Sequence, residues 1–244
     1  MATASSHLGK RVLRLGALAL LLVGLPGCQS INVDATNAAQ LRVITASPDA
    51  PAQDIYQNNS ALAYNLGFGT VTSYMPLAAG TYTLSAAKAN TSQTLASAKA
   101  AFGSTKQYTV ILGNIAANMQ ETILQDQSQP APVGQVSLRF VHQATRVGAV
   151  DIYLIPHGGK LTATSPVATN IDFGSNSSYI NVPAETYAIA VVPAGTTPIP
   201  ATVTLHTGAQ VSYVSGSAHT VVLIDQPVAT TPGVQTVVTD DYEQ

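Results

Sequence analysis

The 244-residue sequence contains a single cysteine, no tryptophan and few charged residues. With Cys28 alone, no disulfide can form within the chain, so its folded units must be stabilised by their hydrophobic cores. Charged residues make up 9% of the chain, whereas 46% of residues are hydrophobic. Disorder requires low hydrophobicity together with high net charge, so this composition predicts a folded chain. A weakly charged chain rich in β-branched residues is typical of all-β secreted proteins.

Basic residues are scarce as well. The chain has 10 Lys and Arg against 12 Asp and Glu, a formal charge of −2. Three of the basic residues, Lys10, Arg11 and Arg14, lie near the N-terminus, and without them the balance is 7 − 12 = −5. Binding to a phosphate backbone requires a basic stripe. We therefore expect no nucleic-acid partner.

The N-terminus has the pattern of a secretion signal. The apolar run Leu15–Val23 follows the basic residues and is too short to span a bilayer as a helix, but it suits the core of a signal peptide. It ends in Leu25-Pro26-Gly27-Cys28, which resembles the bacterial lipoprotein box, where the cysteine becomes the lipidated N-terminus. Pro26 departs from the small or hydroxyl residue usual at that place. Ordinary cleavage that leaves a free thiol is the alternative.

We expect residues 1–27 to be the signal peptide and residues 28–40 to be a polar tether. Gln29 follows the cysteine, where Asp would mark retention in the inner membrane, so the outer membrane of the cell envelope is the expected location. Each buried acyl CH₂ contributes about 0.8 kcal/mol, so several acyl chains on Cys28 would anchor the protein permanently in membrane lipid.

The chain contains an internal repeat. Leu41-Arg-Val-Ile-Thr and Asp54-Ile-Tyr return as Leu138-Arg-Phe-Val-His and Asp151-Ile-Tyr, with one offset, since 138 − 41 = 151 − 54 = 97. Further matches pair Phe68-Gly69 with Phe173-Gly174, Thr109–Leu112 with Thr220–Leu223, and Thr122–Asp126 with Thr236–Asp240. An offset that grows along the chain is expected when insertions fall in loops. The repeat predicts two copies of one folded module.

Short β-branched or alternating runs, separated by Gly and Pro, predict strands in both modules. In the first they are residues 41–45, 54–57, 71–75, 81–87, 107–112 and 121–125; in the second they are 137–142, 150–155, 178–182, 187–192, 201–206, 219–224 and 235–239. The predicted fold class is all-β, with two tandem β-sandwich domains of immunoglobulin-like or transthyretin-like type. We expect repeat 1 at 41–127, a Pro-rich linker crossed by few contacts at 128–136, and repeat 2 at 137–244.

Thr94–Phe102 is ambiguous, because Leu-Ala-Ser-Ala-Lys-Ala-Ala would form a helix by propensity alone. We align it with Ala201–His206, which alternates and is β-branched. Since equivalent positions of a repeat share a structure, we predict a strand at both places.

The stretch Arg42-Val-Ile-Thr-Ala-Ser-Pro-Asp-Ala-Pro-Ala-Gln-Asp-Ile-Tyr56 resembles the opening of a bacterial family, domain of unknown function 4397. Modules of this kind occur singly or in tandem on secreted and lipid-anchored proteins, and the resemblance covers nearly all of the chain after the signal peptide. The second copy has lost Ser-Pro-Asp-Ala-Pro and reads Gln143–Gly148 instead, so a role tied to that turn would not extend to it. The resemblance implies no established activity.

Motifs that carry catalysis or bind metal are absent. The four histidines of the second module, His142, His157, His206 and His219, show no short-range ligand spacing. Asp49, Asp54 and the tail Asp240-Asp241-Tyr-Glu243 lack the alternating pattern of a calcium loop. There is no Gly-x-Ser-x-Gly elbow. We therefore expect no catalytic, cofactor-binding or metal-binding residues and no cofactor.

The sequence thus predicts a lipid-anchored envelope protein that acts as a structural or binding module without catalytic activity and presents loops to an envelope protein or a glycan. A hydrolase of envelope polymers is the alternative. Convergence of His and Asp side chains in one pocket would favour that alternative.

Arg42 and Arg139 occupy one repeat position, and Asp54 and Asp151 occupy another. Alternation puts Leu41 on the core side of its strand and Arg42 on the other. Asp54 lies on the corresponding side of its own strand. If the two strands are neighbours, guanidinium and carboxylate meet. We therefore predict an ion pair within each module, with two solvated charges as the alternative.

The lipoprotein assignment is testable at Cys28. Cys28→Ser should abolish incorporation of labelled palmitate and release the protein from the membrane fraction, because no acyl chain can then be attached. Wild-type protein labelled in parallel is the control. A membrane fraction that keeps the same amount of the variant would contradict the assignment.

Overall fold

The structure is a computed structural model that describes residues 37–226 and 233–242. Cys28, the predicted signal peptide and most of the predicted tether lie outside the described residues. Within those residues, no helix is long and apolar enough to cross a membrane.

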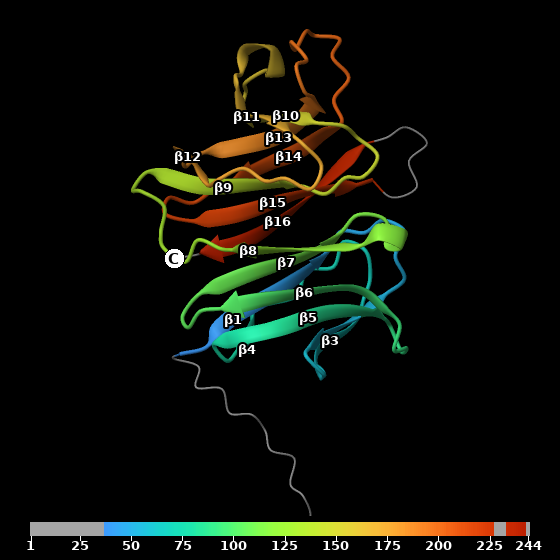
Figure 1. Ribbon diagram of the computed structural model, residues 1–244. Coiled ribbons are helices and arrows are strands. Elements are labelled where there is room, and N and C mark those ends of the chain that lie inside the picture. Colours follow the sequence, from blue (N-terminus) through green and yellow to red (C-terminus); the bar gives the residue numbers. More distant parts are fainter. Residues whose placement is uncertain (1–36, 227–232, 243–244) are drawn as a thin grey trace, which may run out of the picture. The chain divides into compact units, whose positions relative to one another are not determined.

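The first sandwich consists of two four-stranded sheets (Figure 1). Its strands are β1 Ala39–Thr45, β2 Gln53–Gln57, β3 Ser60–Leu66, β4 Met75–Leu77, β5 Gly80–Lys88, β6 Thr94–Phe102, β7 Gln107–Gly113 and β8 Gln120–Gln125, with a short 3₁₀ helix, η1, at Ala116–Asn118. Sheet A has the order β4-β1-β7-β8 and sheet B the order β3-β2-β5-β6. Strands β1 and β7 run parallel, and the other pairs are antiparallel.

The second sandwich repeats this topology. Its strands are β9 Gln135–His142, β10 Val150–Pro156, β11 Pro166–Ile171, β12 Ile180–Pro183, β13 Thr186–Pro193, β14 His206–Ser212, β15 Ala218–Asp225 and β16 Val234–Tyr242, with a 3₁₀ helix, η2, at Leu161–Ala163. Sheet C has the order β12-β9-β15-β16 and sheet D the order β11-β10-β13-β14. The parallel pair is β9–β15, the counterpart of β1–β7. The all-β class and the two sandwiches are therefore confirmed.

Most predicted strands are present, with three corrections. Strands β3 and β11, which pair with β2 and β10, were not predicted. Residues 71–75 were predicted as a strand, but β4 begins only at Met75, and Val71 forms an isolated bridge with Ile44. Residues 201–206 were also predicted as a strand. They instead include a turn in which Thr202 Oγ1 accepts from the Ile199 amide at 2.8 Å, and β14 begins at His206.

Thr94–Phe102 is a strand, β6, as predicted. Its counterpart is β14 and not residues 201–206. Strand β6 pairs with β5 at the edge of sheet B, as β14 pairs with β13 at the edge of sheet D. Tertiary pairing thus overrides the helical propensity of this alanine-rich run.

Each sandwich encloses its own core. Leu41, Val43 and Ile55 belong to the first core, and Leu138, Phe140 and Ile152 belong to the second. The alternation seen in the sequence therefore assigns these side chains to the space between the two sheets of their sandwich.

A third cluster joins the outer face of sheet A to the outer face of sheet C. Its buried members are Ile44, Ala46 and Ile111 from the first sandwich and Val141, Val222 and Ile224 from the second. Neighbouring residues on one strand thus serve different clusters, since Val221 belongs to the core of the second sandwich and Val222 to the cluster between sheets A and C.

The segment between β8 and β9 is attached to the second sandwich. The Ala131 amide donates to the Gly216 carbonyl at 2.9 Å, and the Gln127 amide donates to the Tyr179 hydroxyl at 3.1 Å. The expectation that few contacts cross the linker is therefore wrong, because both sandwiches bury apolar side chains against each other.

Val222→Ala and Val221→Ala form a matched pair, because both side chains are fully buried neighbours on β15. Each should lower the free energy of unfolding by about 1 to 3 kcal/mol. Hydrogen exchange should rise in β1 and β7 of the first sandwich only for Val222→Ala, since only Val222 packs against that sandwich. Equal exchange in β1 and β7 for both variants would contradict a shared cluster.

Candidate functional site

Arg42 and Arg139 both form buried ion pairs, and the closest partner of each is a carboxylate of the other sandwich. Arg42 Nη2 also lies 3.8 Å from Asp126 Oδ2 of its own sandwich. Arg42 Nη2 binds Asp241 Oδ1, and Arg139 Nη2 binds Asp126 Oδ1. Both guanidinium groups and both carboxylates are almost completely buried. The two sandwiches thus exchange arginines across the interface between sheets A and C.

The surroundings of the two arginines correspond in detail. Arg42 Nε donates to Thr109 Oγ1 at 2.8 Å, and its Nη1 donates to the Asp240 carbonyl at 2.8 Å. In the same way, Arg139 Nε donates to Thr220 Oγ1 at 3.1 Å, and its Nη1 donates to the Gln125 carbonyl at 3.0 Å. Charge-assisted hydrogen bonds of this kind are about twice as strong as neutral ones.

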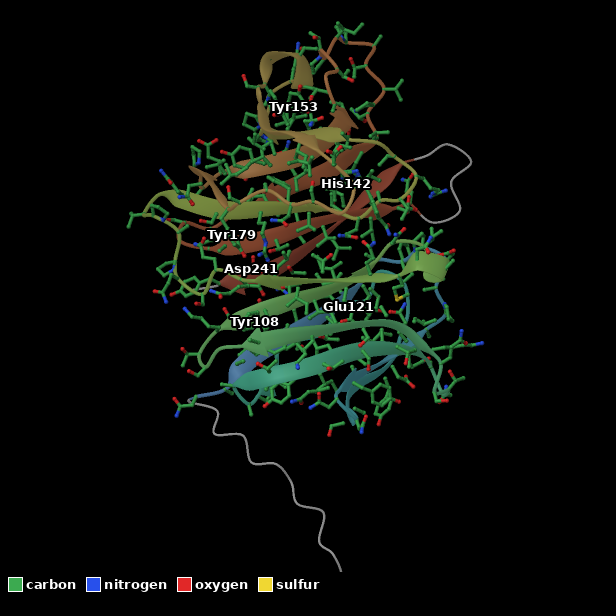
Figure 2. All side chains as sticks on the ribbon, viewed as in Figure 1. Tyr108, Glu121, His142, Tyr153, Tyr179 and Asp241 are labelled. Atoms are coloured by element: carbon green, nitrogen blue, oxygen red, sulfur yellow. The ribbon has the colours of Figure 1, made fainter. Side chains whose placement is uncertain are left out.

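Each carboxylate is also held by its own sandwich. Asp126 Oδ2 accepts from Tyr74 and Thr109, both at 2.7 Å. Asp241 Oδ2 accepts from Tyr179 at 2.6 Å and from Thr220 at 2.7 Å, and Figure 2 labels Tyr179 and Asp241 in this cluster.

The rings of the two tyrosines also contact the guanidinium groups. Their rings lie 4.8 Å from the guanidinium carbons, Tyr74 beside Arg42 and Tyr179 beside Arg139. At this distance a guanidinium is attracted to the electron-rich face of the ring.

Burial is the largest influence on the pKa of three groups in this cluster, Asp241, Tyr74 and Tyr179. Desolvation raises the pKa of the Asp241 carboxyl, with the nearby Asp126 acting in the same direction and Arg42 opposing it. Desolvation likewise raises the pKa of the Tyr74 and Tyr179 hydroxyls, so both remain donors over the physiological range. Two arginines and two aspartates balance each other, which is the condition for burying four charges together.

Asp54 and Asp151, the predicted partners of these arginines, take no part in the ion pairs of the described chain. Asp54 accepts backbone hydrogen bonds from Asn65 at 2.8 Å and Asn90 at 2.9 Å. Asp151 does the same for Asn170 and Gly195, at the same distances.

All four donor residues of these bonds have positive φ angles. The two aspartates therefore hold left-handed residues at two kinds of place. Asn65 and Asn170 lie within the edge strands β3 and β11, whereas Asn90 and Gly195 lie in the loops that follow β5 and β13. Asp54 and Asp151 thus hold the backbone and are not ion-pair partners.

The predicted pairing was wrong because it assumed that β1 and β2 are neighbours. Strand β1 belongs to sheet A and β2 to sheet B. Since Leu41 and Ile55 both face the core between these sheets, Arg42 and Asp54 lie on opposite outer faces of the sandwich.

The alignment of the last strands was also wrong, by one residue. In the first sandwich Tyr108 pairs with Gln125, and in the second its counterpart His219 pairs with Asp240. Asp240 therefore corresponds to Gln125, and Asp241 corresponds to Asp126. A shift of one residue exchanges the two faces of a strand. The irregularity between Ala218 and His219 makes Asp241 the extra residue of a β-bulge.

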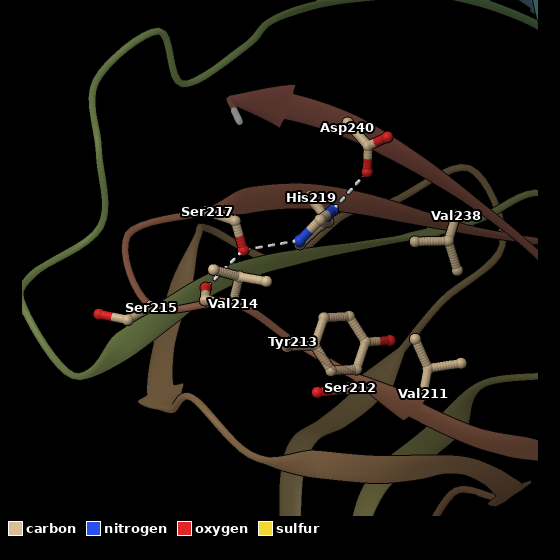
Figure 3. A pocket seen from close by; sticks show the side chains of 9 residues that line it. All are labelled: Val211, Ser212, Tyr213, Val214, Ser215, Ser217, His219, Val238 and Asp240. Atoms are coloured by element: carbon tan, nitrogen blue, oxygen red, sulfur yellow. Dashed lines mark hydrogen bonds and ion pairs between the residues drawn. The ribbon is translucent and has the colours of Figure 1, made fainter. Parts of the chain in front are cut away.

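A pocket of about 410 Å³ opens in the second sandwich at the edge strands β14 and β16 (Figure 3). It is lined by Val211, Ser212, Tyr213, Val214, Ser215, Ser217, His219, Val238 and Asp240. All three valines of the lining, Val211, Val214 and Val238, are exposed. The pocket therefore combines an apolar wall with a polar end.

Ser217, His219 and Asp240 form a hydrogen-bonded chain at the polar end (Figure 3). Ser217 Oγ lies 2.8 Å from His219 Nε2, and His219 Nδ1 lies 2.7 Å from Asp240 Oδ1. These distances match those of a serine hydrolase triad. Sequence reasoning missed this arrangement, because the three residues follow no hydrolase motif and meet only through the pairing of β15 with β16.

The hydroxyl of Ser217 has a second partner that competes with triad chemistry. It donates to the Val214 carbonyl at 2.8 Å, an atom that can only accept. His219 Nε2 is then the donor to Ser217 and cannot take the hydroxyl proton in that arrangement. Ser217 is also only 4% exposed.

Tyr213 contributes an unpaired hydroxyl to this pocket. The residue is 5% exposed, and its hydroxyl has no hydrogen-bond partner among the described residues. In Figure 3 the hydroxyl points to the side of the pocket where Val211 and Val238 lie. Leaving such a buried donor unpaired costs about 1 to 3 kcal/mol. The oxygen has almost no exposed surface, so a ligand would gain affinity from it only after a small movement of the groups around it.

The first sandwich has a pair of aromatic rings, Phe102 and Tyr108, at the corresponding place. Tyr108 and Phe102 of the first copy correspond to His219 and Tyr213 of the second, because both pairs of positions are separated by the same offset, 219 − 108 = 213 − 102 = 111. Tyr108 stands where His219 stands in the second copy and packs edge-on against Phe102, with ring centroids 5.0 Å apart. The serine–histidine–aspartate chain is therefore particular to the second sandwich.

The remaining histidines and acids are dispersed. His142 and His206 contact backbone carbonyls, and burial lowers the pKa of both rings. Asp49 accepts from the Ala116 amide at 2.7 Å. Across residues 37–226 and 233–242, no group of three or more His, Cys, Asp or Glu residues is arranged to hold a metal ion.

The arginine exchange predicts a specific pattern of coupling. Arg42→Met or Asp241→Asn alone should destabilise the protein by about 3 to 5 kcal/mol, because each leaves a buried charge without its partner. The double variant should lose less than the sum, with a coupling energy of about 0.5 to 3 kcal/mol. Chemical denaturation of the four proteins measures it.

Asp54→Asn combined with Arg42→Met is the matched control. The changes in the free energy of unfolding caused by the two substitutions should add to within about 0.5 kcal/mol, because the two side chains share no partner. Additive effects for Arg42 with Asp241, or strong coupling of Arg42 with Asp54, would contradict the assigned pairs.

No curated protein sequence matches the chain significantly. Among solved structures, the family CBM26 module CBMbc of Eubacterium rectale Amy13K, solved with maltoheptaose, is 12% identical with a TM-score of 0.25, over 84% of this chain and 98% of that one. A candidate cell adhesion protein of Bacteroides fragilis is 11% identical with a TM-score of 0.21, over 84% and 98%. The model of a family described as domain of unknown function (DUF4397) matches residues 39–153, from β1 to β10, which supports the resemblance noted in the sequence.

Proposed function

We propose that the protein is a non-catalytic binding module of the cell envelope, anchored in the outer membrane by lipid on Cys28. Its ligand site is the pocket at the edge of the second sandwich. The observation that carries this proposal is the unpaired Tyr213 hydroxyl in a pocket with exposed valines. The expected partner there is another envelope protein that inserts an apolar side chain next to a hydrogen-bonding group.

The composition of the pocket supports a protein partner. Val211, Val214 and Val238 are between 41% and 66% exposed, although their side chains are apolar. Exposed apolar groups with a polar rim are characteristic of protein interaction sites. The polar end, with His219 and Asp240, would fix the orientation of the inserted group.

The interface between the sandwiches supports the same reading. Four buried charges and an apolar cluster join sheets A and C, and His219 and Asp240 of the pocket lie on strands of sheet C. A site formed before the ligand arrives loses less conformational entropy on binding.

Site-specific photo-crosslinking on intact cells tests the proposal. A photoreactive phenylalanine derivative at position 214, on the rim, should give a discrete protein adduct. The same residue at position 133 is the control, since Val133 is 99% exposed in the linker, outside the pocket. Val238→Asp should remove the adduct at 214, because a carboxylate disfavours insertion of an apolar group. Identical adducts at both positions, or none at 214, would overturn the proposal.

Hydrolysis is the second candidate function. It is favoured only by the distances in the chain Ser217–His219–Asp240. Against it stand the burial of Ser217 and the donation of its hydroxyl to the Val214 carbonyl.

A fluorophosphonate probe separates the two functions, because it reacts with serines activated by a histidine. We expect no labelling of the wild-type protein. Ser217→Ala is the control for labelling elsewhere. Stoichiometric labelling that Ser217→Ala abolishes would establish the hydrolase and contradict the proposed binding module.

A further inference from the structure

A second hollow lies on the first sandwich. It has a volume of about 530 Å³ and occupies the outer face of sheet B, between the β2–β3 turn and the β5–β6 loop. Tyr56, Asn58, Asn59, Ser85, Asn90 and Ser92 are among its lining residues. None of the nine residues that line it is charged. We call it the sheet B groove.

The loops that border the sheet B groove are held in place by hydrogen bonds. Asp54 accepts from the Asn90 amide at 2.9 Å and so fixes the β5–β6 loop. In the β2–β3 turn, Asn58 Oδ1 accepts from the Thr83 amide at 3.0 Å, and the Asn58 amide donates to the Thr83 carbonyl at 2.7 Å. The groove is therefore formed before a ligand binds, which lowers the entropic cost of binding.

The second sandwich shows the same face closed. Tyr153, the repeat counterpart of Tyr56, is 3% exposed and belongs to an apolar cluster with Ala190 and Val192. Leu161, from the connection between β10 and β11, packs on this cluster.

The difference between the two faces has a plain origin. The connection between β10 and β11 spans residues 157–165, whereas only Asn58 and Asn59 connect β2 to β3. The shorter turn leaves the face of the first sandwich uncovered. Ser85 stands opposite Tyr56 in the sheet, where Ala190 stands opposite Tyr153. The uncovered copy is thus the more polar one, as expected for a surface that contacts a polar ligand or water.

We infer that the sheet B groove binds a neutral oligosaccharide, an inference that rests on the proposed function as a binding module and adds a second site to it. Amide and hydroxyl side chains both donate and accept hydrogen bonds, as the hydroxyls of a sugar require. The Tyr56 ring, which is half-buried on the floor, offers an apolar surface with a polar tip. Without a charged lining residue, the groove has no partner for phosphates or carboxylates.

The purified protein is tested against an array of neutral and acidic oligosaccharides, followed by titration of the bound neutral ones. Tyr56→Ala should weaken binding at least about tenfold, because stacking area and a hydrogen bond are lost. Tyr64→Ala is the matched control, since Tyr64 lies on β3 of the same sheet, is 65% exposed and does not line the groove. It should change affinity less than about twofold.

Ser92→Glu is a second test in case Tyr56→Ala does not fold, because Ser92 is an exposed loop residue whose substitution should not disturb the sheet. It should also weaken binding of the neutral oligosaccharide, while the melting temperature stays that of the wild type. Val238→Asp, in the pocket of the second sandwich, should leave oligosaccharide binding unchanged.

Several results would overturn the inference. They are no binding to any neutral oligosaccharide, preference for acidic ones, equal loss with Tyr56→Ala and Tyr64→Ala, or loss of binding with Val238→Asp. Crosslinking at position 214 of otherwise wild-type protein is measured independently of these results, so failure of this site is distinguishable from failure of the proposed function.

Discussion

The exchange of arginines between the two sandwiches is the constraint on which the rest of the structure depends. Arg42 reaches Asp241, and Arg139 reaches Asp126, in a space from which water is largely excluded. A buried charge is tolerated only with its partner, so the four residues restrict one another. One consequence is that sheets A and C must meet in a single orientation. The apolar cluster of Ile44, Val222 and their neighbours alone would specify this orientation less strictly, because apolar contacts are not directional.

Much of the fold could be predicted from the sequence, because both copies of the repeat report on the same structure. Alternation at Leu41 and Val43 identified core positions. The strand at Thr94–Phe102 was predicted correctly against its helical propensity, but from an alignment with residues 201–206, whereas its counterpart is β14. Sheet membership could not be predicted in this way. Whether β1 neighbours β2 or β7 depends on pairing between segments distant in sequence, and alternation contains no information about that pairing. This is why the arginines were assigned to the wrong carboxylates.

The candidate site could be predicted only in part. Arg42, Asp54 and their counterparts Arg139 and Asp151 were recognised as repeated charges. All four are buried and form hydrogen bonds or ion pairs. The pocket was missed because Ser217, His219 and Asp240 follow no motif. Asp240 was also aligned with Asp126 by matching letters, whereas a bulge at Asp241 shifts the register by one. In a strand, such a shift decides whether a carboxylate faces the pocket or the arginine cluster.

The two copies have changed in opposite ways, and the arginine exchange explains where change was possible. The faces of sheets A and C are occupied by the interface in both copies, so each sandwich could vary only at its edge strands and at its other outer face. At the edge, the first copy has Tyr108 packed against Phe102, and the second has a pocket beside His219. On the outer face, the second copy is closed over Tyr153 and the first is open around Tyr56. Duplication behind a shared interface therefore lets each copy keep an open surface where the other is closed.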